Sequence, residues 1–112
     1  MSQKLNIAAI QADLKWENPE ANRLYFDDKI NALESDIDLI VLPEMFSTGF
    51  SMKPQHIADE GEMLSWMLSK AATTNSAIAG SLMVAENGLF FNRFYFVEPN
   101  GTFHTYNKRH RW

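Results

Sequence analysis

A chain of 112 residues with 46% hydrophobic and 21% charged side chains has the balance of one globular domain, which excludes a disordered or fibrous protein. Its formal net charge of -4 argues against a protein that binds nucleic acid or an anionic membrane, because basic residues cluster only at positions 107–111. The chain has no cysteine, which excludes disulfide bonds and a thiol nucleophile within these residues, and no apolar run long enough for a signal peptide or a membrane span, so we expect a cytoplasmic protein.

The first part of the chain alternates short apolar runs with a helical pattern. Residues 5–13, LNIAAIQAD, form a compact apolar run that is typical of a buried strand. Residues 18–35 open with Asn18 as the expected N-cap and Pro19 at the first helical position, and apolar residues then recur at helical spacing. The next apolar run, DLIVLPE at residues 38–44, completes a β-α-β unit, which we expect to be right-handed with parallel strands.

A second helix and three antiparallel strands are predicted to follow. Residues 61–75 place methionine, leucine and alanine on one face, and these methionines are typical of core filler in a covering helix. The strands are expected at residues 77–84, 89–97 and 102–108. The Asn87-Gly88 pair predicts the first hairpin, and the turn EPNG at residues 98–101 predicts the second.

The predicted architecture is therefore α/β with a mixed sheet, in the order β-α-β-α-β-β-β. In the middle antiparallel strand both alternating sets are apolar, with Phe90, Phe94 and Phe96 on one face and Leu89, Phe91, Tyr95 and Val97 on the other. Two helices cover one face of such a sheet. The opposite face then needs further chain, a second sheet or a partner subunit.

Glu44 is the first candidate catalytic residue. It follows the apolar run LIVLP, so its carboxylate is expected at the carboxyl end of a strand, where open α/β sheets usually keep their sites. Partial burial there would disfavour the charged form and suit Glu44 to act as a general base. The alternative is an ordinary exposed loop acid, which is the commoner case for a single glutamate.

Two residues on the predicted antiparallel strands are further candidates. Lys108 ends the last strand, and by alternation it shares a face with His104 and Tyr106. An ammonium in such a place stabilises a developing oxyanion, although a solvated strand-end lysine is the commoner case. Asn92 lies among phenylalanines, where a buried amide either contacts the site or, as a satisfied core amide, fixes neighbouring backbone.

No metal or phosphate motif is present in the sequence. His56, His104 and His110 are too scattered for a ligand set, and no HExxH spacing occurs. The glycines never fall into the GxGxxG or GxxxxGK spacing of a phosphate-binding loop. We therefore expect no metal and no cofactor.

Four segments together resemble the nitrilase superfamily of carbon-nitrogen hydrolases. They are NIAAIQAD, DLIVLPEMFSTGF, FFNRFYFVEPNG and YNKRH, which occur in the family's order and span essentially the whole chain. The stretch PEMFSTGFSM is similar to the first catalytic motif of the omega-amidase branch. The resemblance implies a four-layer α-β-β-α sandwich, of which this chain would be the N-terminal part.

The resemblance also implies a Glu-Lys-Cys triad. Glu44 matches the general base and Lys108 the lysine that stabilises the oxyanion, while Phe46 and Asn92 are candidates for supporting the site. In the omega-amidase branch, a small-molecule omega-amide of a 2-oxo dicarboxylic acid, such as 2-oxoglutaramate, is hydrolysed to the acid and ammonia through a cysteine thioester. This chemistry needs no cofactor.

The sequence departs from the family in one decisive respect. The family's cysteine lies C-terminal to the lysine motif, and the chain stops at Trp112 before reaching it. We therefore expect residues 1–112 to be a single partial hydrolase domain, truncated before its nucleophile and inactive alone. The alternative is a catalytically inactive fragment or a protein-interaction module. In either case the uncovered sheet face would support a homodimer or other self-association, with neither nucleic acid nor membrane as a partner.

Overall fold

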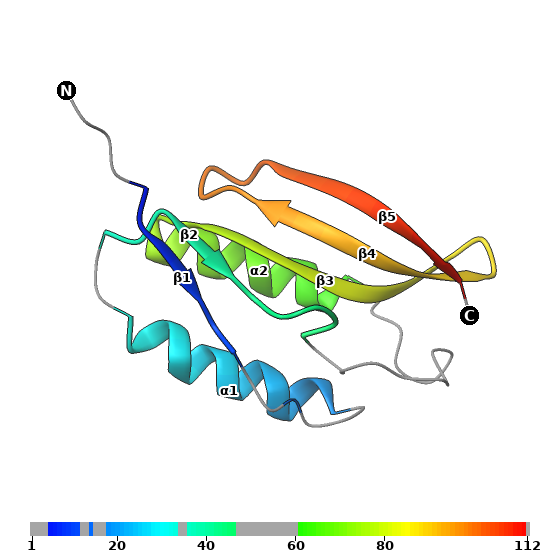
Figure 1. Cartoon of the computed structure of the whole chain (residues 1–112), viewed down its shortest axis with the longest axis horizontal. Helices are drawn as coiled ribbons and strands as arrows, with labels where there is room; N and C mark the ends of the chain where they lie inside the picture. The colour runs from blue at the N-terminus through cyan, green and yellow to red at the C-terminus, as the bar shows by residue number, and fades with distance from the viewer. Residues whose placement is uncertain (1–4, 12–13, 15–17, 34–35, 47–60, 112) are drawn as a thin grey trace.

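The computed structural model describes residues 5–11, 14, 18–33, 36–46 and 61–111 (Figure 1). Within these ranges the chain forms two helices and one mixed sheet. The elements are β1 (Ile7–Ala9), α1 (Pro19–Asn31), β2 (Leu39–Val41), α2 (Glu62–Thr74), β3 (Ala77–Glu86), β4 (Leu89–Val97) and β5 (Phe103–Arg111). Their types and order confirm the predicted α/β class.

The sheet has the strand order β1-β2-β3-β4-β5, so β5 lies at the edge farthest from α1 (Figure 1). β1, β2 and β3 pair in parallel, whereas β3, β4 and β5 pair antiparallel. The parallel pairs are joined by crossover segments that contain the helices, and the antiparallel pairs by tight turns. The sequence predicts both kinds of connection, the helical crossover of the β-α-β unit and the turns of the two hairpins.

The helix boundaries follow local chemistry. The Asn18 side chain accepts a hydrogen bond of 3.1 Å from the Ala21 N–H, and Pro19 begins α1, so the predicted cap is confirmed. α2 ends at Asn75, whose left-handed backbone (φ 53°) stops the helix and lets its N–H reach back to α2 carbonyls. Neither helix of the described residues is long and apolar enough to cross a membrane.

The hydrophobic core lies between the helices and one face of the sheet. It comprises Phe26, Ile30, Ile40, Leu42, Phe46, Met63, Trp66, Met67, Ala71, Ile78, Leu82, Val84, Tyr95 and Val97. The rings of Phe26 and Phe46 pack edge to face at 5.7 Å, and the ring of Phe46 lies 5.7 Å from that of Trp66. These contacts join α1, the segment after β2 and α2 in one core.

A carboxylate on α1 adds a polar link to α2. Asp27 Oδ1 accepts a hydrogen bond of 2.8 Å from Trp66 Nε1 and lies 2.9 Å from Lys70 Nζ. Burial alone raises the pKa of Asp27, but the hydrogen bonds from Lys70 and Trp66 and the charges of Lys70 and Arg23 outweigh it, so the net pKa is lowered. The ionised form of Asp27 is therefore stabilised where the two helices meet.

The hairpin turns have the geometry that the sequence predicts. Asn87 and Gly88 both have positive φ, 54° and 77°, as a two-residue type I′ turn requires. In the second turn Gly101 has φ 94°, and the Glu98 N–H donates to the Thr102 carbonyl at 2.8 Å. These turns set the register of the strand ends that they join.

The opposite face of the sheet is defined by Ser81, Met83, Asn92, Phe94 and Phe96, and we call it the helix-distal face. Their strand neighbours Leu82, Val84, Tyr95 and Val97 point into the helix-side core, and side chains alternate along a strand. Cross-strand pairs place Ser81 opposite Phe94 and Met83 opposite Asn92. The face is buried on β3 and becomes exposed on β5, where Tyr106 is 63% exposed.

Candidate active site

Glu44 lies in a turn just beyond the carboxyl end of β2. β2 is flanked by β1 and β3, and the Leu42 N–H extends its pairing by donating to the Ala79 carbonyl at 2.7 Å. The place of Glu44 at this sheet edge agrees with the sequence pattern. Its side chain is exposed, as in the alternative of an exposed loop acid, so the partial burial that would disfavour its charged form is not observed.

A shallow hollow of about 380 Å³ lies beside this turn. It is lined by Ala9, Ile10, Gln11, Val41, Leu42 and Pro43, at the carboxyl ends of β1 and β2. Glu44 follows the last of these residues directly in the chain. A larger cleft of about 770 Å³ lies between α1 and α2 and is lined by none of the candidate residues. The strand ends are therefore the better setting for a site built on Glu44.

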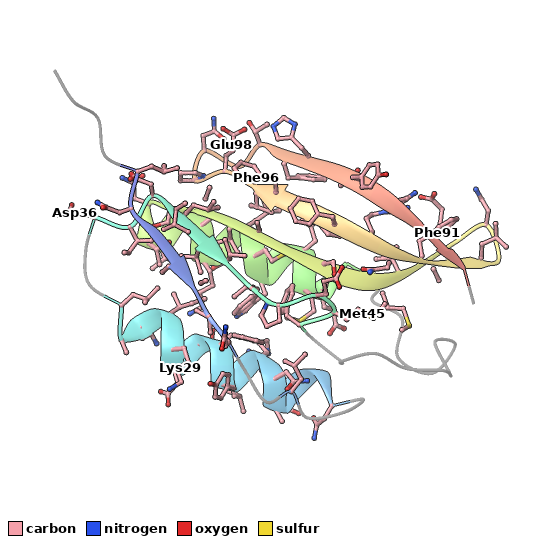
Figure 2. The ribbon with its side chains drawn as sticks, in the orientation of Figure 1. Lys29, Asp36, Met45, Phe91, Phe96 and Glu98 are labelled. Atoms are coloured by element: carbon pink, nitrogen blue, oxygen red, sulfur yellow. The ribbon has the colours of Figure 1, made fainter. Side chains whose placement is uncertain are left out.

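The turn that carries Glu44 is bound to β3 at one residue, Ser81. The Met45 N–H donates to Ser81 Oγ at 2.9 Å, and the Phe46 N–H donates to the Ser81 carbonyl at 3.2 Å. Figure 2 shows Met45 at this junction, past the end of β2. Met45 has a left-handed backbone, φ 48°, which costs a non-glycine residue about 1–2 kcal/mol. The two bonds offset that strain.

Phe46 points away from the helix-distal face. It is fully buried in the helix-side core between Phe26 and Trp66. Gly80 makes room for it, since a Cβ at that position would lie 3.0 Å from the Phe46 ring. Phe46 therefore supports the site by packing: its ring anchors the Glu44 turn in the core, while Ser81 holds the same turn to β3 by hydrogen bonds.

Asn92 lies on the helix-distal face, opposite Met83, with 5% of its surface exposed. Its Oδ1 has no hydrogen-bond partner among the described residues. A buried acceptor without a partner lowers the stability of the fold by about 1–3 kcal/mol. The sequence favours a core amide with all its hydrogen bonds made, and this oxygen does not fit that expectation. An unpaired acceptor on this face is able to bind a donor from a lysine or a substrate amide.

Lys108 belongs to the segment of β5 that faces Asn92. Arg93 pairs with Asn107 and Phe91 pairs with Arg111, so three residues of β5, at 108–110, face the single residue Asn92 of β4. This register shift is a β-bulge. The side chain of Lys108 lies outside the described part of the structure, as do residues 47–52 of the motif that follows Glu44.

The register places the predicted site residues along one path across the sheet. The turn with Glu44 is bound to Ser81, which lies two residues from Met83 on β3; Met83 is opposite Asn92, and Asn92 is opposite the bulge at Lys108. The turn that carries Glu44, the amide of Asn92 and the strand of Lys108 are thus linked through β3 and β4. Within the described ranges, no three histidine, aspartate or glutamate side chains gather as metal ligands would.

Ser81 belongs to this path, although it is part of none of the motifs recognised in the sequence. The sequence carries one signal for it, a serine at the centre of the apolar strand AIAGSLMV. A hydroxyl buried at such a position needs a hydrogen-bond partner. Its partner, the Met45 N–H, is 36 residues away in sequence and is identified by the fold alone.

Residues 6–112 match the family model of carbon-nitrogen hydrolases. The chain belongs to the carbon-nitrogen hydrolase family. The resemblance on which the sequence interpretation rests is thereby confirmed. Known members of this family also match the chain in sequence and in structure.

Among the curated relatives, the omega-amidase YafV of Escherichia coli is 39% identical over 107 residues. The match covers 95% of this chain and 41% of that protein. The 2-oxoglutaramate amidase of Bacillus subtilis is 29% identical over 102 residues, which is 88% of this chain and 39% of the relative. The chain therefore spans about two fifths of the length of these relatives.

Solved structures show the same fold. A CN-hydrolase superfamily protein from Xanthomonas campestris, with an arsenic adduct in its active site, superposes with a TM-score of 0.90 at 32% identity, over 97% of this chain and 42% of that chain. Nit3 of Saccharomyces cerevisiae, a nitrilase superfamily member, shares the fold at a TM-score of 0.79 and 18% identity, over 97% of this chain and 45% of that one. The α/β fold is that of the nitrilase superfamily, of whose domain this chain is a part.

Proposed function

We propose that this chain supplies the general base and the oxyanion-stabilising lysine of an omega-amidase. The carrying observation is Glu44 just beyond the carboxyl end of β2, in a chain 39% identical to an omega-amidase. Membership in the carbon-nitrogen hydrolase family supports amidase-type chemistry. Glu44 and Lys108 take their roles from their match to the family motifs.

In the proposed mechanism Glu44 accepts the proton of a cysteine thiol, and the thiolate attacks the amide carbon. The ammonium of Lys108 stabilises the oxyanion that forms on the carbonyl oxygen. The tetrahedral intermediate collapses, the C–N bond breaks, and ammonia leaves with the proton returned by Glu44. Water then attacks the thioester, again with Glu44 as base, and releases the acid and the thiol.

The cysteine of this mechanism is not among residues 1–112. We propose that these residues are a partial hydrolase domain and are inactive alone, because a hydrolase of this type requires the thiol nucleophile. The share of the relatives that the chain spans, about 41% for the omega-amidase of Escherichia coli, supports this interpretation.

The proposed substrates are omega-amides of short 2-oxo dicarboxylic acids, with 2-oxoglutaramate as the first to test. The names of two relatives support this choice, the omega-amidase of Escherichia coli and the 2-oxoglutaramate amidase of Bacillus subtilis. The reaction needs no cofactor. The cytoplasmic location expected from the sequence stays a prediction.

The test is a fusion protein that joins residues 1–112 to the part of the Escherichia coli omega-amidase that follows its matched region. We expect it to release ammonia from 2-oxoglutaramate, and residues 1–112 alone to release none. Glu44→Gln should lower kcat of the fusion protein by about 10²–10⁴-fold, because general-base catalysis contributes that much. Glu20→Gln, at an exposed glutamate in the first turn of α1, is the matched control and should leave kcat unchanged.

Two results would contradict the proposal. One is a fusion protein that circular dichroism shows to be folded but that releases no ammonia. The other is ammonia release by residues 1–112 alone that Glu44→Gln abolishes, because it would require a nucleophile other than cysteine.

Self-association is a second candidate function, and exposed apolar side chains near the edge of the sheet favour it. Tyr106 is 63% exposed, and Phe103 and Leu89 are 43% and 40% exposed. Tyr106 lies opposite Phe94, so it belongs to the helix-distal side of β5. Sedimentation of residues 1–112 should show a dimer or larger species, and Tyr106→Ser should shift it toward monomer. A monomer at all concentrations would argue against this interaction.

A further inference from the structure

Ser81 is a buried polar residue in the middle of an apolar strand. It is 1% exposed, and its strand neighbours Leu82 and Met83 are buried as well. Its side chain and its carbonyl both accept hydrogen bonds from the turn after β2, the side chain from Met45 and the carbonyl from Phe46. These donors are the two residues that directly follow Glu44.

The two bonds depend on Ser81 in different ways. The carbonyl bond to Phe46 is available to any residue at this position, because it uses the backbone alone. The bond to Met45 requires a side-chain hydroxyl. Met45 is 4% exposed, so without that hydroxyl its N–H loses its partner in a buried setting. Its left-handed backbone then has one bond fewer to hold it.

The position of the serine also argues for a role at the site. Ser81 lies opposite Phe94, which places its side chain on the helix-distal face together with Asn92. Phe46 holds the same turn from the helix-side core. The peptide that follows Glu44 is thus fixed from both faces of the sheet, and the serine hydroxyl is the contact on the side of Asn92 and the Lys108 strand.

We propose that Ser81 is a positioning residue that holds Glu44 in place for proton transfer. This inference rests on the proposed function of Glu44 as a general base. The hydroxyl fixes the Met45 peptide, and the Met45 peptide fixes the Cα of Glu44, one residue away. Proton transfer requires the base within about 3 Å of its partner, and a displacement of about 1 Å costs on the order of 10²-fold in rate.

Three variants test the role in the fusion protein described above. Ser81→Ala removes the acceptor, Ser81→Thr keeps a hydroxyl on a residue that suits a strand, and Ser76→Ala is the matched control. Ser76 is 2% exposed, and its hydroxyl donates to the Ile37 carbonyl, away from the Glu44 turn. Both alanine variants therefore lose a buried serine hydrogen bond, and only one of them alters the turn.

We expect Ser81→Ala to lower kcat about 10²-fold with KM within about 2-fold, because the turn is displaced while the binding walls are kept. Ser81→Thr should restore kcat to within about 5-fold of the unsubstituted protein, and Ser76→Ala should retain it. Equal kcat in Ser81→Ala and Ser76→Ala would overturn the proposal. So would a loss in Ser81→Ala that Ser81→Thr does not restore in a folded protein.

A second measurement does not depend on activity. In residues 1–112, amide hydrogen exchange should become at least about tenfold faster at Met45 in Ser81→Ala and stay unchanged there in Ser76→Ala. If exchange at Met45 becomes faster only in Ser81→Ala but the fusion protein is inactive, Ser81 does fix the turn and the proposed function of Glu44 is wrong. Unchanged exchange at Met45 would overturn the role of Ser81, whatever the activity.

Discussion

Trp66 of α2 donates its indole N–H to the carboxylate of Asp27 on α1 at 2.8 Å, and Lys70 Nζ lies 2.9 Å from the same oxygen. One carboxylate oxygen thereby joins the two helices over the core. The Asp27 side chain is 23% exposed, so water screens this link only in part. Its charge is favoured in the folded state, which makes the link dependent on pH.

We predict that Asp27→Asn lowers the free energy of unfolding at about pH 7 by roughly 1–2 kcal/mol, since Lys70 loses its charged partner in a partly buried place. The pKa of Asp27 is lowered on folding, so its contribution is present above the unfolded value and is lost as pH falls through the folded value. Urea unfolding at about pH 7 and about pH 2 measures the difference. Asp28→Asn, at an exposed neighbour, is the control and should change the free energy of unfolding little at either pH. If Asp27→Asn lowers the free energy of unfolding equally at both pH values, the charge of Asp27 is not the cause.

A second prediction separates stability from activity at Asn92. Asn92→Leu removes a buried oxygen that has no partner among the described residues, so the free energy of unfolding should stay within about 0.5 kcal/mol or rise by up to about 1 kcal/mol. In the fusion protein kcat should fall, since an amide at the site is lost. Asn22→Leu, at another buried asparagine, should instead lower the free energy of unfolding by about 1–3 kcal/mol, because Asn22 has an interaction partner. Chemical unfolding compares the two variants, and a large loss of stability in Asn92→Leu would mean that the Asn92 side-chain amide is hydrogen-bonded in solution.

A third prediction concerns the space that Gly80 leaves for Phe46. A Cβ at Gly80 would lie 3.0 Å from the Phe46 ring and 3.1 Å from Leu42 Cβ. Gly80→Ala should therefore lower the free energy of unfolding by about 1–3 kcal/mol and, by moving Phe46, disturb the turn of Glu44. Ala85→Val, which adds atoms at an exposed position of the same strand, should cost less than about 0.5 kcal/mol. Thermal unfolding tests both variants, and equal stability of the two would show that the Phe46 ring moves aside at little cost in free energy.

A fourth prediction concerns Lys108. In the fusion protein, Lys108→Ala should lower kcat about 10²–10³-fold with a small change in KM, because the oxyanion forms only during the reaction. Lys108→Arg keeps the charge but places it differently, so it should restore a part of the rate. Arg109→Ala, at the next residue of the same basic cluster, should retain kcat within about 2-fold. Steady-state ammonia release measures all three, and similar losses at Lys108 and Arg109 would point to a general effect of charge.

The features that the sequence predicted well are those that depend on neighbouring residues. Asn18 and Pro19 set the start of α1 through one capping bond and a fixed φ. Asn87-Gly88 forms the first hairpin because both residues tolerate positive φ. Such signals act over a few residues and need no knowledge of the fold.

The features that the sequence did not predict depend on residues far apart in the chain. The bond of Ser81 to Met45 spans 36 residues and that of Trp66 to Asp27 spans 39. Asn92 Oδ1 has no partner among the described residues, and Asn92 faces a register shift in β5 that no local pattern in the chain specifies.

The strand order of the sheet has a consequence for protein synthesis. Among the strands that the structure describes, each pairs with the one before it in the chain, and none is inserted between two earlier ones. During translation, every strand therefore leaves the ribosome after the neighbour on which it must form its hydrogen bonds. The sheet can grow from β1 toward β5 in the order of synthesis, without waiting for a distant segment to separate strands that have already paired.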